Sequence, residues 1–181
     1  KKFELSNSLI ILDKQSKDKI EHQIRKVVKA LQLNNCVIKG DIVLRGGKPY
    51  VIEIAARLSG GDFSESLVPI SQGINYVEAA LKLAVMENPD LSKLKPIKNL
   101  TVANRYFFAP RGRLKEVTGV DKIVAEPWLH KIEIWIKPGE LIDKIGSHSE
   151  RSGVFVVVGD TRTEVQKRID QVYRTVKFLM Y

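Results

Sequence analysis

The chain has 181 residues, of which 44% are hydrophobic and 28% are charged, a balance typical of a soluble globular protein with one or two domains. No stretch approaches the roughly 18 uncharged apolar residues of a membrane-spanning helix, and the first residues lack the apolar region of a signal peptide. The net charge of +9 comes from scattered lysines without a basic block, which favours a solvated surface over a nucleic-acid-binding one. We therefore expect neither a membrane nor a nucleic acid as a partner.

The sequence holds a single cysteine, Cys36, which cannot form a disulfide within the chain. A lone cysteine favours a reducing compartment, so we expect a cytoplasmic protein. Because Cys36 stands beside Val37 and Ile38 in an apolar run, we also expect its thiol to be buried and unreactive. The chain begins at Lys1 rather than at a methionine, so we expect it to be a piece of a longer protein.

The first half of the chain predicts two helices around a hairpin. Apolar residues at helical spacing predict a helix over residues 16–33. Two β-rich runs flank the sequence R-G-G-K-P at residues 45–49, which predicts a hairpin. A capping-box pattern that starts at Asn75 predicts a second helix ending near residues 88–89. Residues 91–98 break this pattern, and we expect a linker there.

The second half of the chain is rich in strands. Strands are predicted over residues 101–108, 130–137 and 154–158, and a capping box at residues 161–164 predicts the start of a last helix. The mixed order of helices and strands predicts an α+β fold rather than a doubly wound sheet. We expect two domains, residues 1–97 and residues 98–181.

Two carboxylates stand on the predicted hairpin, Asp41 on its first strand and Glu53 on its second. With a two-residue loop, 46–47, Asp41 would face Ile52, whereas with a three-residue loop, 46–48, it would face Glu53. Facing β-carbons would be about 4.5–5.5 Å apart, and two carboxylates that close repel unless a cation lies between them. Oxygen ligands at this spacing suit Mg²⁺. A solvent-facing acidic pair on the wet side of the hairpin is the alternative.

Further polar residues follow the second strand. Arg57 shares the strand parity of Glu53, so it either pairs with Glu53 or holds a transferring phosphoryl group beside the metal. The stretch Ser59-Gly60-Gly61 offers backbone N–H groups that a ligand can approach closely, because glycine has no side chain in the way. Most Gly-Gly pairs are only turns, and a simple turn is the alternative here.

The stretch D-I-V-L-R-G-G-K-P-Y-V-I-E-I-A-A-R-L-S-G-G resembles the C-terminal lobe of the ATP-grasp superfamily, the carboxylate–amine (or carboxylate–thiol) ligases. The motif of that lobe is an acidic residue, a hairpin and then E-x-N-x-R. The residues from about Leu100 are similar to the small unit that follows this lobe in carbamoyl-phosphate-synthetase-like members. The resemblance implies an enzyme in which ATP phosphorylates a carboxylate, and an amine or another nucleophile then displaces phosphate from the acyl-phosphate.

The resemblance also implies roles for individual residues, with ATP and Mg²⁺ (or Mn²⁺) as cofactors. It makes Asp41 and Glu53 the metal ligands and places Arg57 against the transferred phosphoryl group. The apolar positions that line the adenine pocket would be Val43 and Ile52. The residues that hold the carboxylate substrate or a phosphate would be Ser59, Gly60 and Gly61.

Two features depart from the family's pattern. Ala55 stands where the motif has asparagine, so one metal ligand is absent, and a second Mg²⁺ would rest on Glu53, phosphate and water. The sequence also lacks the N-terminal lobe that supplies the glycine-rich phosphate loop, the lysines and the adenine-binding hinge. We therefore expect that this chain alone does not turn over ATP, and that it works with such a lobe on small-molecule carboxylate and amine substrates.

Two other functions stay open. A degenerate lobe would bind nucleotide or a partner without catalysis, with Ala55 as its sign, and mutation of Glu53 would then leave function intact. A basic nucleic-acid-binding domain would show binding that weakens steeply with salt, for which the scattered lysines give little reason. The sequence does not identify the carboxylate or the amine, and it leaves open whether a homodimer forms.

Overall fold

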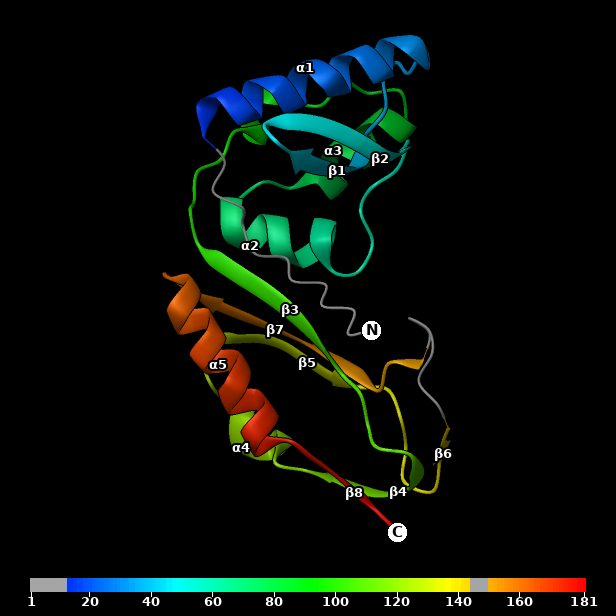
Figure 1. Cartoon of the computed structure of the whole chain (residues 1–181), viewed down its shortest axis with the longest axis vertical. Coiled ribbons are helices and arrows are strands. Elements are labelled where there is room, and N and C mark those ends of the chain that lie inside the picture. Colours follow the sequence, from blue (N-terminus) through cyan, green and yellow to red (C-terminus); the bar gives the residue numbers. More distant parts are fainter. Residues whose placement is uncertain (1–12, 144–149) are drawn as a thin grey trace. The chain divides into compact units, whose positions relative to one another are not determined.

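The computed structural model describes residues 13–143 and 150–181 (Figure 1). The chain divides into two compact units, and the division falls between Ile97 and Lys98. Each unit combines helices with antiparallel strands, so the fold is α+β as expected. In the described residues, no helix is long and apolar enough to cross a membrane.

The first unit begins with α1, Lys14–Ala30, close to the predicted helix. Asp13 caps its start, because its carboxylate accepts hydrogen bonds from the backbone N–H and the hydroxyl of Ser16 at 2.7 and 2.9 Å. These hydrogen bonds hold the pKa of the Asp13 carboxyl below its ordinary value. Figure 1 shows α1 in blue, lying along the hairpin in cyan, and α1 contacts the second hairpin strand.

The hairpin consists of β1, Lys39–Arg45, and β2, Lys48–Ala55, paired antiparallel. Its loop has two residues, 46–47, because Arg45 pairs with Lys48. Both loop glycines have positive φ angles, 57° and 70°, as a tight type I′ turn requires. The three-residue loop that would have placed the two carboxylates opposite each other is therefore wrong.

A bulge in β2 restores the register that the short loop would have lost. The partner of Ile42 is Val51, and the partner of Asp41 is Glu53, so Ile52 is the extra residue. Without this bulge, Asp41 would face Ile52 and point away from Glu53. The two carboxylates thus meet by a different route from the one that the loop length predicted.

Cys36 is exposed, so the expectation of a buried thiol is wrong. The apolar run that contains Cys36 does not form a strand at that point. β1 begins only at Lys39, and Cys36 lies in the connection that follows α1. The run therefore did not indicate burial, because its first residues lie outside the sheet.

The rest of the first unit is a series of helical turns. They are the π-helical turn η1, Phe63–Leu67, the helices α2, Val68–Gln72, and α3, Tyr76–Ala84, and the 3₁₀ turn η2, Leu91–Leu94. α3 begins at the predicted capping box, since the Asn75 side chain accepts a hydrogen bond from the backbone N–H of Glu78 at 3.0 Å. The predicted linker thus contains the short turn η2.

The second unit holds two three-stranded antiparallel sheets, ordered β3-β7-β5 and β6-β4-β8. The first sheet contains the three predicted strands and consists of β3, Thr101–Phe107, β5, Leu129–Ile134, and β7, Gly153–Gly159. The second consists of β4, Gly112–Thr118, β6, Leu141–Ile142, and β8, Lys177–Met180. Among the described residues, the unit also contains the helices α4, Val120–Ile123, and α5, Arg162–Thr175.

The core of the second unit lies between the β3-β7-β5 sheet and α5, which Figure 1 shows in orange and red against that sheet. Residues 154–157 of β7 have no exposed surface, as the continuous apolar run predicted. The ring of Tyr173 on α5 packs edge-on against Phe107 and Phe155, and its hydroxyl donates to the backbone oxygen of Tyr106 at 3.0 Å. Burial of this hydroxyl raises the pKa of Tyr173.

Candidate functional site

Asp41 and Glu53 form a carboxylate pair on the exposed face of the hairpin. Each is the Cα partner of the other, and their side chains are 56% and 54% exposed. Facing side chains of an antiparallel pair point to the same side of the sheet, so both carboxylates are open to solvent from one direction. The structure therefore brings together the two residues that the sequence predicted as metal ligands.

Lys39 lies between the two carboxylates. Its Nζ donates to Oδ2 of Asp41 at 2.7 Å and to Oε1 of Glu53 at 3.3 Å. The hydrogen bond to Asp41 and then the one to Glu53 raise the pKa of the Lys39 ammonium above its ordinary value. The cation that two adjacent carboxylates need is thus a side chain of the hairpin itself.

Sequence reasoning missed Lys39, although a signal was present. Lys39 precedes Asp41 by two residues on the same strand, and residues two apart on a strand share a face. A basic residue at that position is within reach of both members of a facing carboxylate pair. The alternating pattern of β1 could therefore have identified it.

The donor atoms of the carboxylate pair fit Mg²⁺ under one condition. Mg²⁺ accepts one or two protein carboxylates and completes its shell with phosphate and water, and both carboxylates here are accessible to a hydrated ion. Ala55, opposite Lys39 at the end of β2, adds no oxygen from its side chain. Within the described residues no three His, Cys, Asp or Glu side chains gather as a metal cage. The pair therefore suits an ion that arrives with ligands of its own, provided that Lys39 moves away.

An apolar surface borders the carboxylate pair on the same face of the hairpin. Val43 follows Asp41 by two residues, and its strand partner is Tyr50. The side chains of Val43, Tyr50 and Ile52 are 50%, 51% and 69% exposed. Val43 and Ile52 were predicted to line an adenine pocket. Tyr50 was not among the predicted residues, although it lies two residues before Ile52 on the same strand. Three exposed hydrophobic side chains in a row form a surface that a flat apolar ring can cover.

Arg57 does not extend the strand as its parity suggested, because β2 ends at Ala55. Its Nη1 donates to the backbone oxygen of Leu58 at 3.0 Å. Among the ion pairs of the described residues, none joins Arg57 to Glu53. The alternative in which Arg57 serves only to neutralise Glu53 is therefore not observed.

The segment after Arg57 forms a tight turn. The Ser59 backbone N–H donates to the hydroxyl of Ser64 at 3.1 Å, so this donor is already engaged. At Gly60 an added Cβ would meet no atom within 4 Å, which leaves its backbone open to a ligand. Gly61 and Asp62 have positive φ angles of 67° and 68°. This left-handed conformation is one that glycine, as at residue 61, adopts without steric cost.

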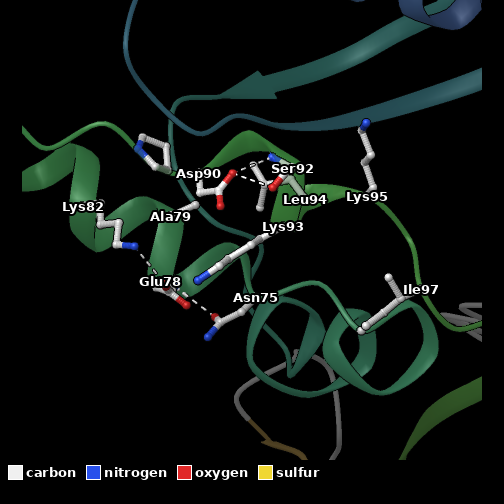
Figure 2. Close-up of a pocket in the computed structure, with 12 residues that line it drawn as sticks. Asn75, Glu78, Ala79, Lys82, Asp90, Ser92, Lys93, Leu94, Lys95 and Ile97 are labelled. Carbon is white, nitrogen blue, oxygen red and sulfur yellow. Dashed lines mark hydrogen bonds and ion pairs between the residues drawn. The ribbon is translucent and has the colours of Figure 1, made fainter.

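A cavity of about 370 Å³ lies between α3 and η2, away from these residues (Figure 2). Figure 2 shows Lys82 and Lys93 pointing towards Glu78, and Nζ of Lys82 lies 2.8 Å from Oε1 of Glu78. This hydrogen bond lowers the pKa of Glu78 and raises the pKa of Lys82. None of the residues that the sequence predicted for a site lines this cavity.

A comparison with protein families matches residues 105–180, in the second unit, to the family described as L-amino acid ligase C-terminal domain 2. Among curated proteins, the uncharacterized protein y4rH of Sinorhizobium fredii (strain NBRC 101917 / NGR234) is 28% identical over 129 residues. The match covers 71% of this chain and 26% of that protein. The chain thus spans about a quarter of the curated relative that it matches.

Solved structures share the fold over nearly the whole chain. Phosphoribosylglycinamide synthetase from Anaerococcus prevotii matches with a TM-score of 0.84 and 23% identity, over 95% of this chain and 44% of that one. L-amino acid ligase from Bacillus licheniformis matches with a TM-score of 0.79 and 18% identity, over 96% and 43%. Biotin carboxylase from Campylobacter jejuni, solved as a complex with ATP, matches with a TM-score of 0.68 and 14% identity, over 96% and 38%.

These matches confirm the resemblance that the hairpin motif indicated. This chain spans less than half of each of the three structures, and each of them is an ATP-grasp ligase. The antiparallel sheets and flanking helices are those of the C-terminal lobe of such enzymes. The chain therefore has the fold of the C-terminal part of the ATP-grasp ligases, and its second unit matches the L-amino acid ligase C-terminal domain 2 family.

Proposed function

We propose that the chain is part of an ATP-dependent carboxylate–amine (or carboxylate–thiol) ligase that acts through an acyl-phosphate. Residues 1–97 would be the metal- and nucleotide-binding lobe, and residues 98–181 the small domain that follows it. The observation that carries this proposal is the bulged register that places Asp41 opposite Glu53. A bulge next to a functional residue commonly serves to re-aim a side chain, and here it unites the two carboxylates of the family motif.

In the proposed site, the carboxylates of Asp41 and Glu53 would hold Mg²⁺ (or Mn²⁺). When bound, this ion neutralises the negative charge of the ATP phosphates. The exposed surface of Val43, Tyr50 and Ile52 offers apolar contact to adenine. Most of the catalytic effect then comes from positioning and from charge neutralisation, because phosphoryl transfer needs little covalent help from the protein.

Arg57 and the turn after it serve the reacting groups in this proposal. The Arg57 guanidinium has donors left for a phosphoryl oxygen, since its hydrogen bond to the Leu58 oxygen uses one of them. Ser59, Gly60 and Gly61 hold the carboxylate substrate or a phosphate, with the open backbone at Gly60 as the point of approach. These groups would keep the carboxylate oxygen in line with the γ-phosphorus.

The proposed reaction has two steps. A carboxylate oxygen attacks the γ-phosphorus, the bond between that phosphorus and the bridging oxygen of ADP breaks, and ADP leaves. The amine nitrogen then attacks the acyl carbon, the carbon–oxygen bond to phosphate breaks, and the nitrogen loses a proton. The match to the L-amino acid ligase C-terminal domain 2 family favours an amino acid as the carboxylate substrate.

Hydroxylamine trapping tests this function. The full-length protein with Mg-ATP, pooled L-amino acids and hydroxylamine is expected to form amino-acid hydroxamates together with ADP, because hydroxylamine intercepts an acyl-phosphate. The product is measured by mass spectrometry, and β,γ-methylene-ATP serves as the matched control that cannot transfer its phosphoryl group. ADP release that is independent of any carboxylate, without hydroxamate, would count against the ligase.

Two further proposals concern the setting of the reaction. We propose that the site works only together with an N-terminal lobe, since the matching ligases are more than twice as long as this chain. The residues 1–181 alone are then expected to release no ADP in the same assay. We also propose a cytoplasmic location, because the thiol of Cys36 is exposed and unpaired, as a reducing compartment allows.

A non-catalytic lobe is the second candidate function, and two observations favour it. Ala55 removes one ligand of the family motif, and the Lys39 ammonium already offsets one of the two negative charges of the carboxylate pair. In that case the hairpin would bind nucleotide or a partner protein without turnover. Substitution of Glu53 separates this candidate from the ligase, because only the ligase would lose its function.

A further inference from the structure

Lys39 differs in exposure from the two carboxylates that it bridges. Its side chain is only 19% exposed, while the two carboxylates that it bridges are each more than half exposed. The lysine stem is thus more buried than the two carboxylates that its ammonium contacts. It occupies the region between Oδ2 of Asp41 and Oε1 of Glu53 that a shared divalent ion would use.

We propose that Lys39 is an exchangeable counter-ion of the carboxylate pair. While no divalent ion is bound, its ammonium holds Asp41 and Glu53 together. When Mg²⁺ binds, the ammonium leaves both carboxylates. This inference rests on the proposed function, because it assigns a part to Lys39 at the metal site of that function.

The two cations compete for the same carboxylates. Mg²⁺ binds carboxylate oxygens at about 2.0–2.1 Å, and the ammonium lies 2.7 Å from Oδ2 of Asp41. An ion of two positive charges at that carboxylate would repel the ammonium at close range. The longer contact of 3.3 Å to Glu53 is the weaker of the two hydrogen bonds from the ammonium.

The lysine side chain allows such an exchange without a change in the backbone. Lysine carries its charge on a flexible four-carbon stem with rotatable bonds, so the ammonium moves by changes of rotamer. Lys39 is also the first residue of β1, at the open end of the hairpin. The exchange therefore leaves the strand pairing of Asp41 with Glu53 intact. Because a divalent ion must displace the ammonium, Lys39 lowers the affinity of the carboxylate pair for that ion.

Competition between Lys39 and the metal is tested by Mn²⁺ binding to the full-length protein, measured by electron paramagnetic resonance. The variant Lys39→Met is expected to lower the Kd for Mn²⁺ by about fivefold, as expected for the loss of two partly exposed ion-pair contacts. Lys48→Met removes the same charge from the same hairpin and is the matched control. Lys48 lies about 20 Å along the strands from Lys39, beyond the screening length of about 8 Å. The Kd of the Lys48→Met variant for Mn²⁺ is therefore expected to differ from that of wild type by less than about twofold.

Release of the ammonium is tested by the chemical reactivity of Lys39. Under limiting acetylation with N-hydroxysuccinimide acetate, Lys39 is expected to react faster with saturating Mn²⁺ than without it, while Lys48 reacts at the same rate in both conditions. Mass spectrometry of peptides measures both rates. A lysine that only supports the fold would show equal or slower acetylation in the presence of the metal.

The outcomes separate this inference from the proposed function. If wild-type protein and Lys39→Met bind Mn²⁺ equally well, or if Mn²⁺ does not speed acetylation of Lys39, the counter-ion role is wrong and the metal site stands. If neither protein binds Mn²⁺, the metal site and the counter-ion role both fail. If Lys39→Met binds Mn²⁺ more tightly than wild type and Lys48→Met does not, the counter-ion role is supported.

Discussion

Glu53→Gln in the full-length protein is expected to lower kcat/KM for ATP-dependent ligation by about 10²–10³-fold, the loss typical of removing one group that stabilises transition-state charge. Glutamine keeps the shape of the side chain and one of its oxygens, but it removes the negative charge. Asp41 would then be the only carboxylate at the metal site, and the contact of 2.7 Å from Lys39 would neutralise it. The Mg²⁺ ion would lose both a ligand and the charge that attracts it.

The fold is expected to tolerate this change. The Glu53 side chain is more than half exposed, and its contact with Lys39 is long for an ion pair, 3.3 Å. Exposed pairs of this kind contribute roughly 0–1 kcal/mol to the free energy of unfolding. Urea unfolding is therefore expected to give nearly the same stability for the variant and for wild type, so the loss of activity would not reflect unfolding.

Glu21→Gln is the matched control for Glu53→Gln. Glu21 lies on α1 in the same unit, its side chain is 62% exposed, and it pairs with Arg25 one helical turn away. The control removes the same charge and an exposed ion pair, and activity is expected to stay near that of wild type. Full ligase activity in Glu53→Gln, or an equal loss in both variants, would show that the carboxylate pair does not bind the catalytic metal.

Gly119→Ala is expected to destabilise the second unit by about 3–4 kcal/mol. Gly119 has a φ of 83°, a left-handed conformation that costs a residue with a side chain about 1–2 kcal/mol. An added Cβ would also overlap the backbone oxygen and carbon of Thr175, at the end of α5. Overpacking of this kind costs typically about 1–3 kcal/mol, and a backbone atom held between α5 and β8 cannot turn aside as a flexible side chain would.

Gly139→Ala separates the two parts of that cost. Gly139 has nearly the same φ, 89°, but an added Cβ there would meet no atom within 4 Å. Its expected loss is therefore only the conformational part, about 1–2 kcal/mol. The comparison is made by urea unfolding of the two variants under identical conditions. Equal losses would mean that the Thr175 backbone relaxes away from the new methyl group.

The sequence predicted the pairing of Asp41 with Glu53 better than it predicted the path of the chain around them. Asp41 and Glu53 were expected to face each other, but the expected reason was a three-residue loop, and the bulge at Ile52 does this instead. A bulge leaves no reliable mark in a single sequence, because it depends on how two strands fit over the helix beneath them. The same hairpin pattern therefore led to the correct pairing of Asp41 with Glu53 and to the wrong loop length.

The second unit shows a similar limit. The apolar runs of β3 and β7 predicted strands because most of their side chains are buried, and the capping box predicted α5. β4, β6 and β8 were missed, since short edge and half-exposed strands lack a strong apolar pattern. Their place is set by pairing between distant segments, which a local pattern cannot reveal.

Lys39 and Cys36 show what local sequence reasoning cannot weigh. Lys39 was given no role, although strand parity places it with Asp41, because its contact with Glu53 depends on the partner strand. Cys36 was expected in the core because of its apolar neighbours, but β1 begins three residues later. In both cases the side chain's environment follows from where a strand begins and which strand faces it.

The most direct test of the metal site is a crystal structure of the full-length protein with Mg²⁺ and a non-hydrolysable ATP analogue. The site proposed here predicts a Mg²⁺ ion about 2.0–2.1 Å from one oxygen of Asp41 and one of Glu53, with phosphate oxygens completing its shell. The adenine would lie against Val43, Tyr50 and Ile52. A nucleotide and metal bound elsewhere, with Lys39 still bridging Asp41 and Glu53, would contradict the account.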